Sequence, residues 1–262
     1  MSFHPIKRLG QNFLNDPNTA RKIVASLQAP PDAHVVEIGP GQGALTGLLM
    51  DAYANLTALE VDPRAVAFLH ETYPGLDVRQ ADVLAVDWAA LAEEKGGPLY
   101  VIGNLPYYIT SQILFALLDA RLHVGEVVVM MQLEVAQRLV AVTRTKAYGI
   151  LSVLVQLYGR PELLFKVSPN VFYPRPDVTS AVVRLDCSGP ARAGDIDREH
   201  LRKVVRTAFN QRRKTLRNSL QIWTREAGFD LPNGWDACRA EELCPEAFVE
   251  LAHFLGGPVE RG

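Results

Sequence analysis

Short apolar runs alternate with helix-length amphipathic segments up to about residue 186 of this 262-residue chain, and this alternation limits the fold more than any other feature. Runs of β-rich composition occur at residues 34–39, 55–62, 77–83, 98–106 and 126–132. The pattern is typical of a parallel sheet covered on both faces by helices. Two later runs, at 163–167 and 179–186, would pair as a hairpin and complete a mixed seven-stranded sheet.

The segment 187–197 interrupts this pattern, because it is rich in glycine, proline, alanine and charge. The sequence that follows is helical in character from residue 198 to residue 255. We therefore predict an α/β domain over residues 1–190 and a small all-helical domain over residues 191–262. With 48% hydrophobic residues, the chain can supply the larger domain with a sizeable core.

The composition argues against several classes of protein. No stretch reaches the roughly 18 apolar residues of a membrane span, and residues 1–11 lack the apolar part of a secretory signal, so we expect a cytoplasmic protein without a membrane partner. Cys187, Cys238 and Cys244 are scattered, which favours small half-buried residues over a disulfide framework or a metal site with His253. The net charge is −2, so any nucleic-acid function must rest on local basic clustering.

A glycine-rich turn follows the first predicted strand, in the sequence VVEIGPGQGALT at residues 35–46. Glycine lets a ligand approach the backbone closely, and open α/β sheets bind ligands at the carboxyl ends of their strands. The spacing of Gly39, Gly41 and Gly43 is that of a nucleoside-methyltransferase loop, whereas Gly39, Gly41 and Ala44 also satisfy a relaxed dinucleotide motif. The turn indicates a cofactor that contains adenosine, or else a purely structural connection.

Carboxylates follow the next two predicted strands. Glu60 ends the second strand, where its side chain can accept hydrogen bonds from both ribose hydroxyls of either cofactor. Asp62 precedes Pro63 and is expected to cap the following helix. Asp82 follows the third strand and can accept from the adenine amine of the cofactor, although a carboxylate at a strand end is equally often a solvated loop residue.

The sequence Gly103-Asn104-Leu105-Pro106-Tyr107, at the end of the fourth strand, discriminates between these cofactors. An adenine amine is a poor nucleophile because its lone pair is delocalised into the ring, so its methylation needs hydrogen-bond acceptors and not a strong base. The Asn104 amide oxygen and a main-chain carbonyl near Leu105 are such acceptors, Pro106 holds Leu105 extended, and Tyr107 offers a face to the base. The alternative is an Asn-x-Pro turn that merely ends a strand.

A second aromatic segment, NVFYPRP at residues 170–176, precedes the last predicted strand. Its prolines stiffen the loop, and Phe172 is predicted to cover the opposite face of a base rotated out of its stack. The alternative is a loop aromatic that fills the core.

Basic residues cluster in the helical region, where residues 198–217 contain a single acid, Glu199. In an otherwise acidic chain, such clustering predicts a phosphate-binding face, and solvated helix surface is the alternative. The residues of this cluster are Arg198, Arg202, Lys203, Arg206, Arg212, Arg213, Lys214 and Arg217.

Five ordered motifs together resemble the KsgA/RsmA family of ribosomal RNA adenine dimethyltransferases. They are KRLGQNFLND at residues 7–16, EIGPGQGALT at 37–46, GNLPY at 103–107, KAYG at 146–149 and FNQRRKTLRNSL at 209–220. The resemblance implies a Rossmann-like class I methyltransferase fold, with a small C-terminal helical domain that binds RNA or the ribosome. It implies S-adenosylmethionine as the methyl donor and no metal.

The resemblance also implies roles for single residues. Asn12 and Leu14 should close over the methyl donor, whose site is completed by Gly39, Gly41, Glu60, Asp82 and Asn104. The target adenine would be held by Asn104, Leu105, Pro106, Tyr107 and Phe172, and RNA by Arg206, Arg212, Arg213, Lys214 and Arg217. Members of the family transfer two methyl groups to the N6 amine of each of two neighbouring adenosines near the 3′ end of small-subunit rRNA, in the assembling subunit. We expect the protein to be a monomer. Two features depart from the family: Tyr108, where many members have Asn, and the acidic net charge.

Other functions remain open on this evidence. A related resistance-type methyltransferase of large-subunit rRNA would share the fold and the Asn-x-Pro-Tyr chemistry, although the segment 209–220 favours the small subunit. A dehydrogenase would share the glycine loop and Glu60 but would not need Asn104. A ribosome-assembly factor whose binding matters more than its catalysis is a third possibility.

Overall fold

The computed structural model describes residues 4–6, 9–227 and 230–256, so Lys7 and Arg8 of the first motif lie outside the described residues. The chain forms two compact units. Unit 1 comprises Met1–Ala136 and Arg160–Gly189, and unit 2 comprises Gln137–Gly159 and Pro190–Gly262. Among the residues described, no helix has the length and apolarity needed to cross a membrane.

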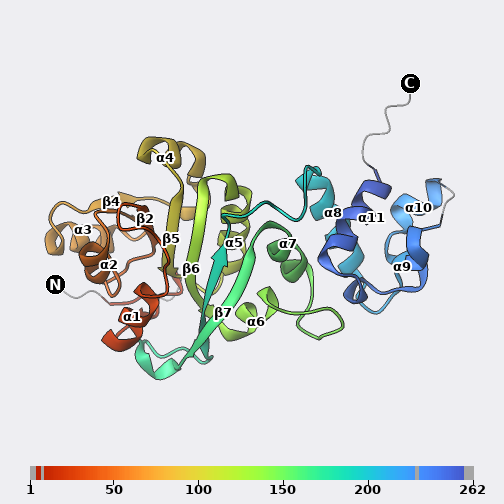
Figure 1. Cartoon of the computed structure of the whole chain (residues 1–262). Coiled ribbons are helices and arrows are strands. Elements are labelled where there is room, and N and C mark those ends of the chain that lie inside the picture. Colours follow the sequence, from red (N-terminus) through yellow and green to blue (C-terminus); the bar gives the residue numbers. More distant parts are fainter. Residues whose placement is uncertain (1–3, 7–8, 228–229, 257–262) are drawn as a thin grey trace. The chain divides into compact units, whose positions relative to one another are not determined.

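A seven-stranded mixed sheet forms the centre of unit 1 (Figure 1), as predicted. The strand order is β4-β3-β2-β5-β6-β9-β7, and β9 is antiparallel to both of its neighbours whereas the other pairs are parallel. The strands are β2 (His34–Ile38), β3 (Asn55–Glu60), β4 (Asp77–Gln80), β5 (Leu99–Asn104), β6 (Val124–Gln132), β7 (Arg160–Val167) and β9 (Ser180–Asp186). A separate two-stranded sheet pairs β1 (Phe13–Leu14) with β8 (Phe172–Tyr173).

Helices connect the strands of unit 1, and short polar residues begin several of them. The side chains of Asp16, Asp62 and Asp87 accept hydrogen bonds from main-chain N–H groups in the first turns of α1, α3 and α4, and Gly96 ends α4 with a left-handed conformation. The helical elements are α1 (Pro17–Val24), α2 (Thr46–Ala52), α3 (Pro63–Thr72), η2 (Val83–Ala85), α4 (Trp88–Lys95), α5 (Thr110–Asp119), η3 (Arg121–His123), α6 (Leu133–Leu139) and η4 (Pro169–Val171).

One face of the sheet packs against α1 and α2 through a continuous hydrophobic cluster. Ile23 of α1 and Leu49 of α2 are buried against Val35, Ile102 and Val128, which come from three neighbouring strands. Because β2, β5 and β6 are parallel, their carboxyl ends lie together at one end of the sheet.

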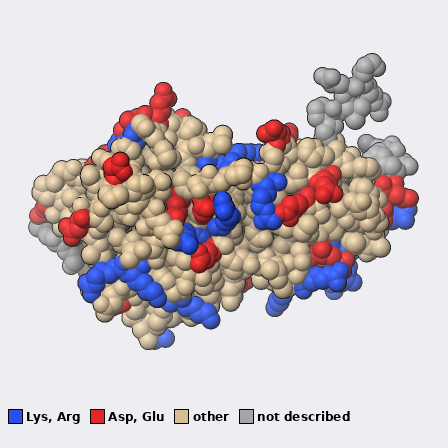
Figure 2. Space-filling model, viewed as in Figure 1, with Lys and Arg blue, Asp and Glu red and all other residues tan. Residues whose placement is uncertain are grey.

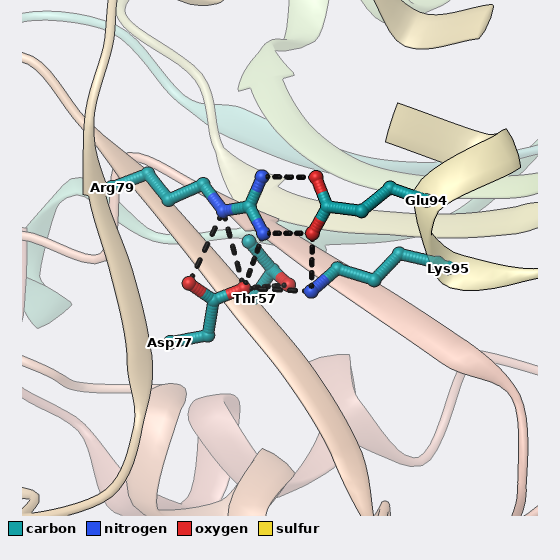
Figure 3. Close-up of polar contacts among 5 residues, drawn as sticks. All are labelled: Thr57, Asp77, Arg79, Glu94 and Lys95. Atoms are coloured by element: carbon teal, nitrogen blue, oxygen red, sulfur yellow. Dashed lines mark hydrogen bonds and ion pairs between the residues drawn. The ribbon is translucent and has the colours of Figure 1, made fainter. Parts of the chain in front are cut away.

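A network of charges closes the β4 edge of the sheet (Figure 3). Arg79 of β4 contacts Asp77 of the same strand and Glu94 of α4, and Lys95 donates to Asp77 at 2.8 Å. Thr57 of β3 also donates to Asp77 at 2.9 Å. Although burial opposes it, the sum of these hydrogen bonds holds the pKa of Asp77 well below its usual range. The network ties the end of α4 to an edge strand, which covers an edge that would otherwise be open to pairing.

Unit 2 is helical and has its own core. Tyr148 is buried beside Phe209, and Phe209 stacks on Phe248 with ring centroids 5.6 Å apart. The Tyr148 hydroxyl donates to the carbonyl of Leu243 at 2.8 Å. The elements are α7 (Ile150–Tyr158), α8 (Arg198–Asn210), α9 (Leu216–Ser219), α10 (Gln221–Ala227), η5 (Pro232–Ala237), η6 (Ala240–Glu242) and α11 (Pro245–Phe254).

The structure divides the chain differently from the predicted domains of residues 1–190 and 191–262. Residues 137–159 belong to the helical unit, because α7 packs with α8 and α11 while Tyr148 enters the same core. The later boundary lies between Gly189 and Pro190, close to the predicted one.

Candidate active site

A cavity of about 290 Å³ lies in unit 1 at the carboxyl ends of β2, β3 and β5. Its volume is close to the lower end of the roughly 300–1,000 Å³ that is typical of small-molecule sites. The cavity is lined by the turn after β2, the ends of β3 and β5, the start of η2 and the segment of residues 9–14 that contains β1. The predicted donor-site residues that line it are Asn12, Leu14, Gly39, Gly41, Glu60, Asp82 and Asn104.

The glycine turn brings the backbone of Gly41 close to the ring of Phe13 at the cavity wall. Gly41 has a φ of +56°, and a Cβ atom there would lie 2.9 Å from Cε1 of Phe13. Real Cβ atoms essentially never approach so closely, and L side chains rarely adopt this φ, so two independent restrictions favour glycine. The turn therefore fixes the position of β1 over the cavity.

Two buried carboxyl groups line the cavity. Glu60 accepts hydrogen bonds from the main-chain N–H of Gly41 at 3.0 Å and of Asp62 at 2.9 Å, and burial raises its pKa. Glu37 of β2 accepts from the Thr46 hydroxyl at 2.7 Å, and burial raises its pKa to about 8. An apolar wall with two acidic groups favours a ligand that carries positive charge and hydroxyl groups.

Asp62 and Asp82, the other two carboxylates singled out in the sequence, cap helical turns. Asp62 caps α3, as predicted, and hydrogen bonds led by Arg64 lower its pKa to about 2. Asp62 also accepts from Gln11 Nε2 at 2.9 Å, which ties the N-terminal segment to this helix start. Asp82 lines the cavity, and its side chain accepts from the N–H of Leu84 at 3.0 Å as the cap of η2.

Asn104 links the end of β5 to the N-terminal segment. Its Nδ2 donates to the carbonyl of Asn12 at 3.0 Å. An amide has its donors on one end and its acceptor on the other, so this bond leaves Oδ1 as the end that is available to a ligand. Asn104 therefore contacts a segment that lines the cavity and also presents an acceptor.

The three residues that follow Asn104 form a rigid turn. Leu105 is buried and its N–H donates to the carbonyl of Met130 at 3.0 Å. The Pro106 carbonyl accepts from the Thr110 hydroxyl at 3.0 Å, so it is already engaged. The Tyr107 hydroxyl and the buried Ser180 hydroxyl lie 2.6 Å apart, and burial raises the pKa of Tyr107. The ring of Tyr107 is thus held at the cavity by β9.

Phe172 lies in the hydrophobic core instead of at the cavity. Only 5% of it is exposed, and it shares the cluster that contains Leu14 and Val167. The pairing of β1 with β8 sets Leu14 opposite Phe172 and Phe13 opposite Tyr173, which is 57% exposed. This arrangement corresponds to the alternative of a loop aromatic that fills the core, and contact of Phe172 with a bound base stays a prediction.

The predicted RNA-binding residues of unit 2 have different surroundings. Arg212 donates to Glu241 at 2.7 Å and to the carbonyls of Lys146 and Thr145 at 2.8 and 2.9 Å, so its guanidinium holds the loop after α6. Arg217 forms an exposed ion pair with Asp230. The predicted residues that the structure leaves exposed without an ion pair to another described residue are Arg206, Arg213 and Lys214.

The sequence of residues 3–250 matches the model of a known family, described as ribosomal RNA adenine dimethylase. The chain belongs to this family. Over 253 residues it is 57% identical to the ribosomal RNA small subunit methyltransferase A of Salinibacter ruber (strain DSM 13855 / M31), a match that covers 97% of this chain and 86% of that protein. As a member of the dimethylase family, the chain is a methyltransferase, and both family and fold imply the use of S-adenosylmethionine.

Solved structures agree with the fold of this dimethylase. A dimethyladenosine transferase from Plasmodium falciparum has a TM-score of 0.73 with 22% identity, and the match covers 91% of this chain and 95% of that one. The 23S rRNA methyltransferase ErmE has a TM-score of 0.67 with 27% identity, covering 93% and 99%. The predicted Rossmann-like methyltransferase fold is confirmed.

Sequence reasoning missed three residues of the dimethylase site. Glu37 was detectable, because a charged residue interrupts an otherwise apolar strand. Gln11 and Ser180 offered no comparable signal, since their partners, Asp62 and Tyr107, lie far away in the sequence.

Proposed function

We propose that this protein transfers methyl groups from S-adenosylmethionine to the N6 amines of two adjacent adenosines near the 3′ end of small-subunit rRNA. Its partner is the assembling small ribosomal subunit, and it acts in the cytoplasm as a monomer. The observation that carries the proposal is the cavity that joins the glycine turn and Glu60 to Asn104 and Tyr107.

The cavity fits the proposed methyl donor on two grounds. Each oxygen of Glu60 accepts one main-chain N–H and keeps a further lone pair for a ribose hydroxyl. Glu37 and Glu60 are buried acids at the cavity wall, and a cationic ligand compensates the cost of keeping them ionised. Asn12, Leu14, Gly39, Gly41 and Asp82 would complete the site. When bound, S-adenosylmethionine supplies an electrophilic methyl group on a positively charged sulfur.

The residues after β5 hold the amine that is to be methylated. The Oδ1 atom of Asn104 accepts one N–H of that amine and the Leu105 carbonyl accepts the other, which concentrates electron density on the nitrogen. Pro106 keeps Leu105 in place, and Tyr107 stacks on the base while its hydroxyl is anchored to Ser180. As the carbon–nitrogen bond forms, the methyl–sulfur bond of the donor would break. The methylated amine would then release its proton to water, so these residues need to accept hydrogen bonds and not to act as a strong base.

The choice of the small subunit is supported by sequence similarity. The chain is 57% identical to a small subunit methyltransferase and 27% identical to the large-subunit enzyme ErmE. On unit 2, Arg206, Arg213 and Lys214 are placed on the exposed surface, where they would contact rRNA phosphates.

The test supplies labelled methyl donor with undermethylated small subunits or with large subunits, followed by mapping of the labelled bases. Label on two adjacent adenosines near the 3′ end of small-subunit rRNA is expected. Label confined to large-subunit rRNA would transfer the assignment to the rival substrate. A protein that binds small subunits but leaves no label would instead be an assembly factor without this activity.

A further inference from the structure

The Lys and Arg residues of unit 1 fall into two groups according to their partners. Arg64, Arg79, Lys95, Arg160 and Arg184 form ion pairs with acids, and Arg121 donates to the carbonyl of Gly189. The other four cations in the described part of this unit are exposed and form no ion pair within 4 Å with an acid among the described residues. They are Arg21, Lys22, Lys166 and Arg175.

These four residues, which we call the cationic surface, come from neighbouring segments. Lys22 of α1 lies with its Nζ 3.9 Å from the ring centroid of Phe165 in β7, so α1 and β7 are in contact there. Lys166 is the next residue of β7, and Arg175 follows β8 by two residues. Figure 2 shows Lys and Arg side chains gathered over α1, at the lower left of the view. Asp16 caps α1, and hydrogen bonds from Thr19, together with the nearby charge of Arg21, lower the pKa of Asp16. The Arg21 guanidinium itself donates to the Asn18 side chain at 2.7 Å on the exposed surface of α1.

The cationic surface includes residues at the same end of the sheet as the candidate active site, although β6 and β9 lie between β7 and β5. β7 is antiparallel to β9, which is antiparallel to β6, so β7 runs in the same direction as β5. Lys166 is the penultimate residue of β7. It therefore lies at the carboxyl end of its strand, as does Asn104, the last residue of β5. Arg21 and Lys22 belong to the helix that directly follows β1, whose two residues line the cavity.

We propose that the cationic surface binds phosphates of the substrate RNA next to the adenosine that enters the cavity. The inference rests on the proposed function, because it takes RNA as the polyanion. Unpaired cations lose no ion pair when they bind a phosphate, whereas the paired cations of unit 1 would have to exchange one partner for another. Binding here would give unit 1 its own hold on RNA, independent of the basic residues of unit 2.

The experiment measures RNA affinity against salt in the absence of methyl donor. The probe is a fluorescent RNA hairpin from the 3′ end of small-subunit rRNA, titrated at about 50 to about 200 mM salt. The triple variant Arg21→Gln, Lys22→Gln and Lys166→Gln should lose about 2 units from the slope of log affinity against log salt, at about 0.7 per phosphate contact. Its melting temperature should fall only slightly, because exposed charges contribute little to stability and the largest loss is the contact of Lys22 with the Phe165 ring.

Two single variants form a matched control on one strand. Arg160→Gln removes the same charge as Lys166→Gln, but from the other end of β7, roughly 20 Å away. Lys166→Gln should flatten the salt dependence and Arg160→Gln should leave it unchanged. Equal slopes for the triple variant and the wild type would overturn the proposal, as would equal effects of the two single variants.

Two further outcomes separate this inference from related ideas. If the triple variant loses binding to phosphatidylserine vesicles but binds RNA like the wild type, the cationic surface binds a membrane and the proposal is overturned. RNA affinity is measured without methyl donor, so it does not depend on catalysis. If the triple variant loses RNA affinity while the wild type fails to methylate undermethylated small subunits, the cationic surface stands and the proposed function is refuted.

Discussion

Replacing Asn104 by Ala tests one contact that the structure shows, from Nδ2 to the Asn12 carbonyl, and one that we propose, from the target amine to Oδ1. The variant loses the 3.0 Å hydrogen bond from Nδ2 to the Asn12 carbonyl, which holds the segment over the donor cavity. A hydrogen bond of this kind contributes about 1 kcal/mol, so the donor Kd should rise about fivefold. The variant also loses the Oδ1 acceptor, and removal of one oriented polar group at a reacting centre typically slows the chemical step by about 100- to 1,000-fold.

Gln11→Ala is the matched control for the first of these contacts. Gln11 also anchors the N-terminal segment, since it donates to Asp62 at 2.9 Å and accepts from the Ile6 N–H at 2.8 Å. We assign it no contact with the target amine, so this variant should weaken donor binding and transfer methyl groups at nearly the wild-type rate once saturated. Calorimetry gives the donor Kd, and single-turnover transfer to undermethylated subunits gives the rate. Wild-type transfer by Asn104→Ala under saturation would refute the acceptor role, and an unchanged donor Kd would refute the anchoring role.

Three other changes probe the buried acids and the tyrosine anchor. Glu60→Ala should weaken donor binding by about 1.5–3 kcal/mol, measured by calorimetry, because the ribose hydroxyls lose a charged acceptor. Burial raises the pKa of Glu37 from 4.5 to about 8. The contribution of protonated Glu37 to stability is therefore present below pH 4.5 and is lost as the pH rises to 8. Without methyl donor, the melting temperature of Glu37→Gln should fall less over that pH range than that of the wild type. Ser180→Ala should cost about 1–3 kcal/mol in denaturant unfolding by leaving the Tyr107 hydroxyl unpaired, and adding Tyr107→Phe should recover most of it.

The parts of the fold that could be predicted are those governed by local periodicity. The strands over His34–Ile38 and Leu99–Asn104 are short apolar runs. A glycine turn follows the first, and the second ends at the polar Asn104, which are residue types that ligand-binding sites use. The assignment of residues 137–159 to the helical unit could not be predicted in this way. Nearly every residue of α7 is apolar, so its sequence indicates burial without indicating a partner.

The positions of site residues were more predictable than their contacts. Glu60 and Asn104 end parallel strands, and parallel strands necessarily bring their carboxyl ends together. The inward orientation of the Phe172 side chain could not be predicted in this way. It is set by the register between β1 and β8, which are short and far apart in the sequence. A two-residue pairing carries too little pattern to specify which aromatic faces inward.

The number of basic residues in a segment also does not show which of them are available to a ligand. Arg212 stands in the densest basic run of the chain, yet three of its five N–H donors bind Glu241 and two main-chain carbonyls. Lys166 stands alone between Phe165 and Val167 in an apolar strand and still faces solvent without an acidic partner among the described residues. A phosphate competes only for donors that the fold leaves available, so pairing decides which cations can bind RNA. For a chain with a net charge of −2, we therefore expect affinity for RNA to depend on where unpaired cations lie more than on how many basic residues the sequence contains.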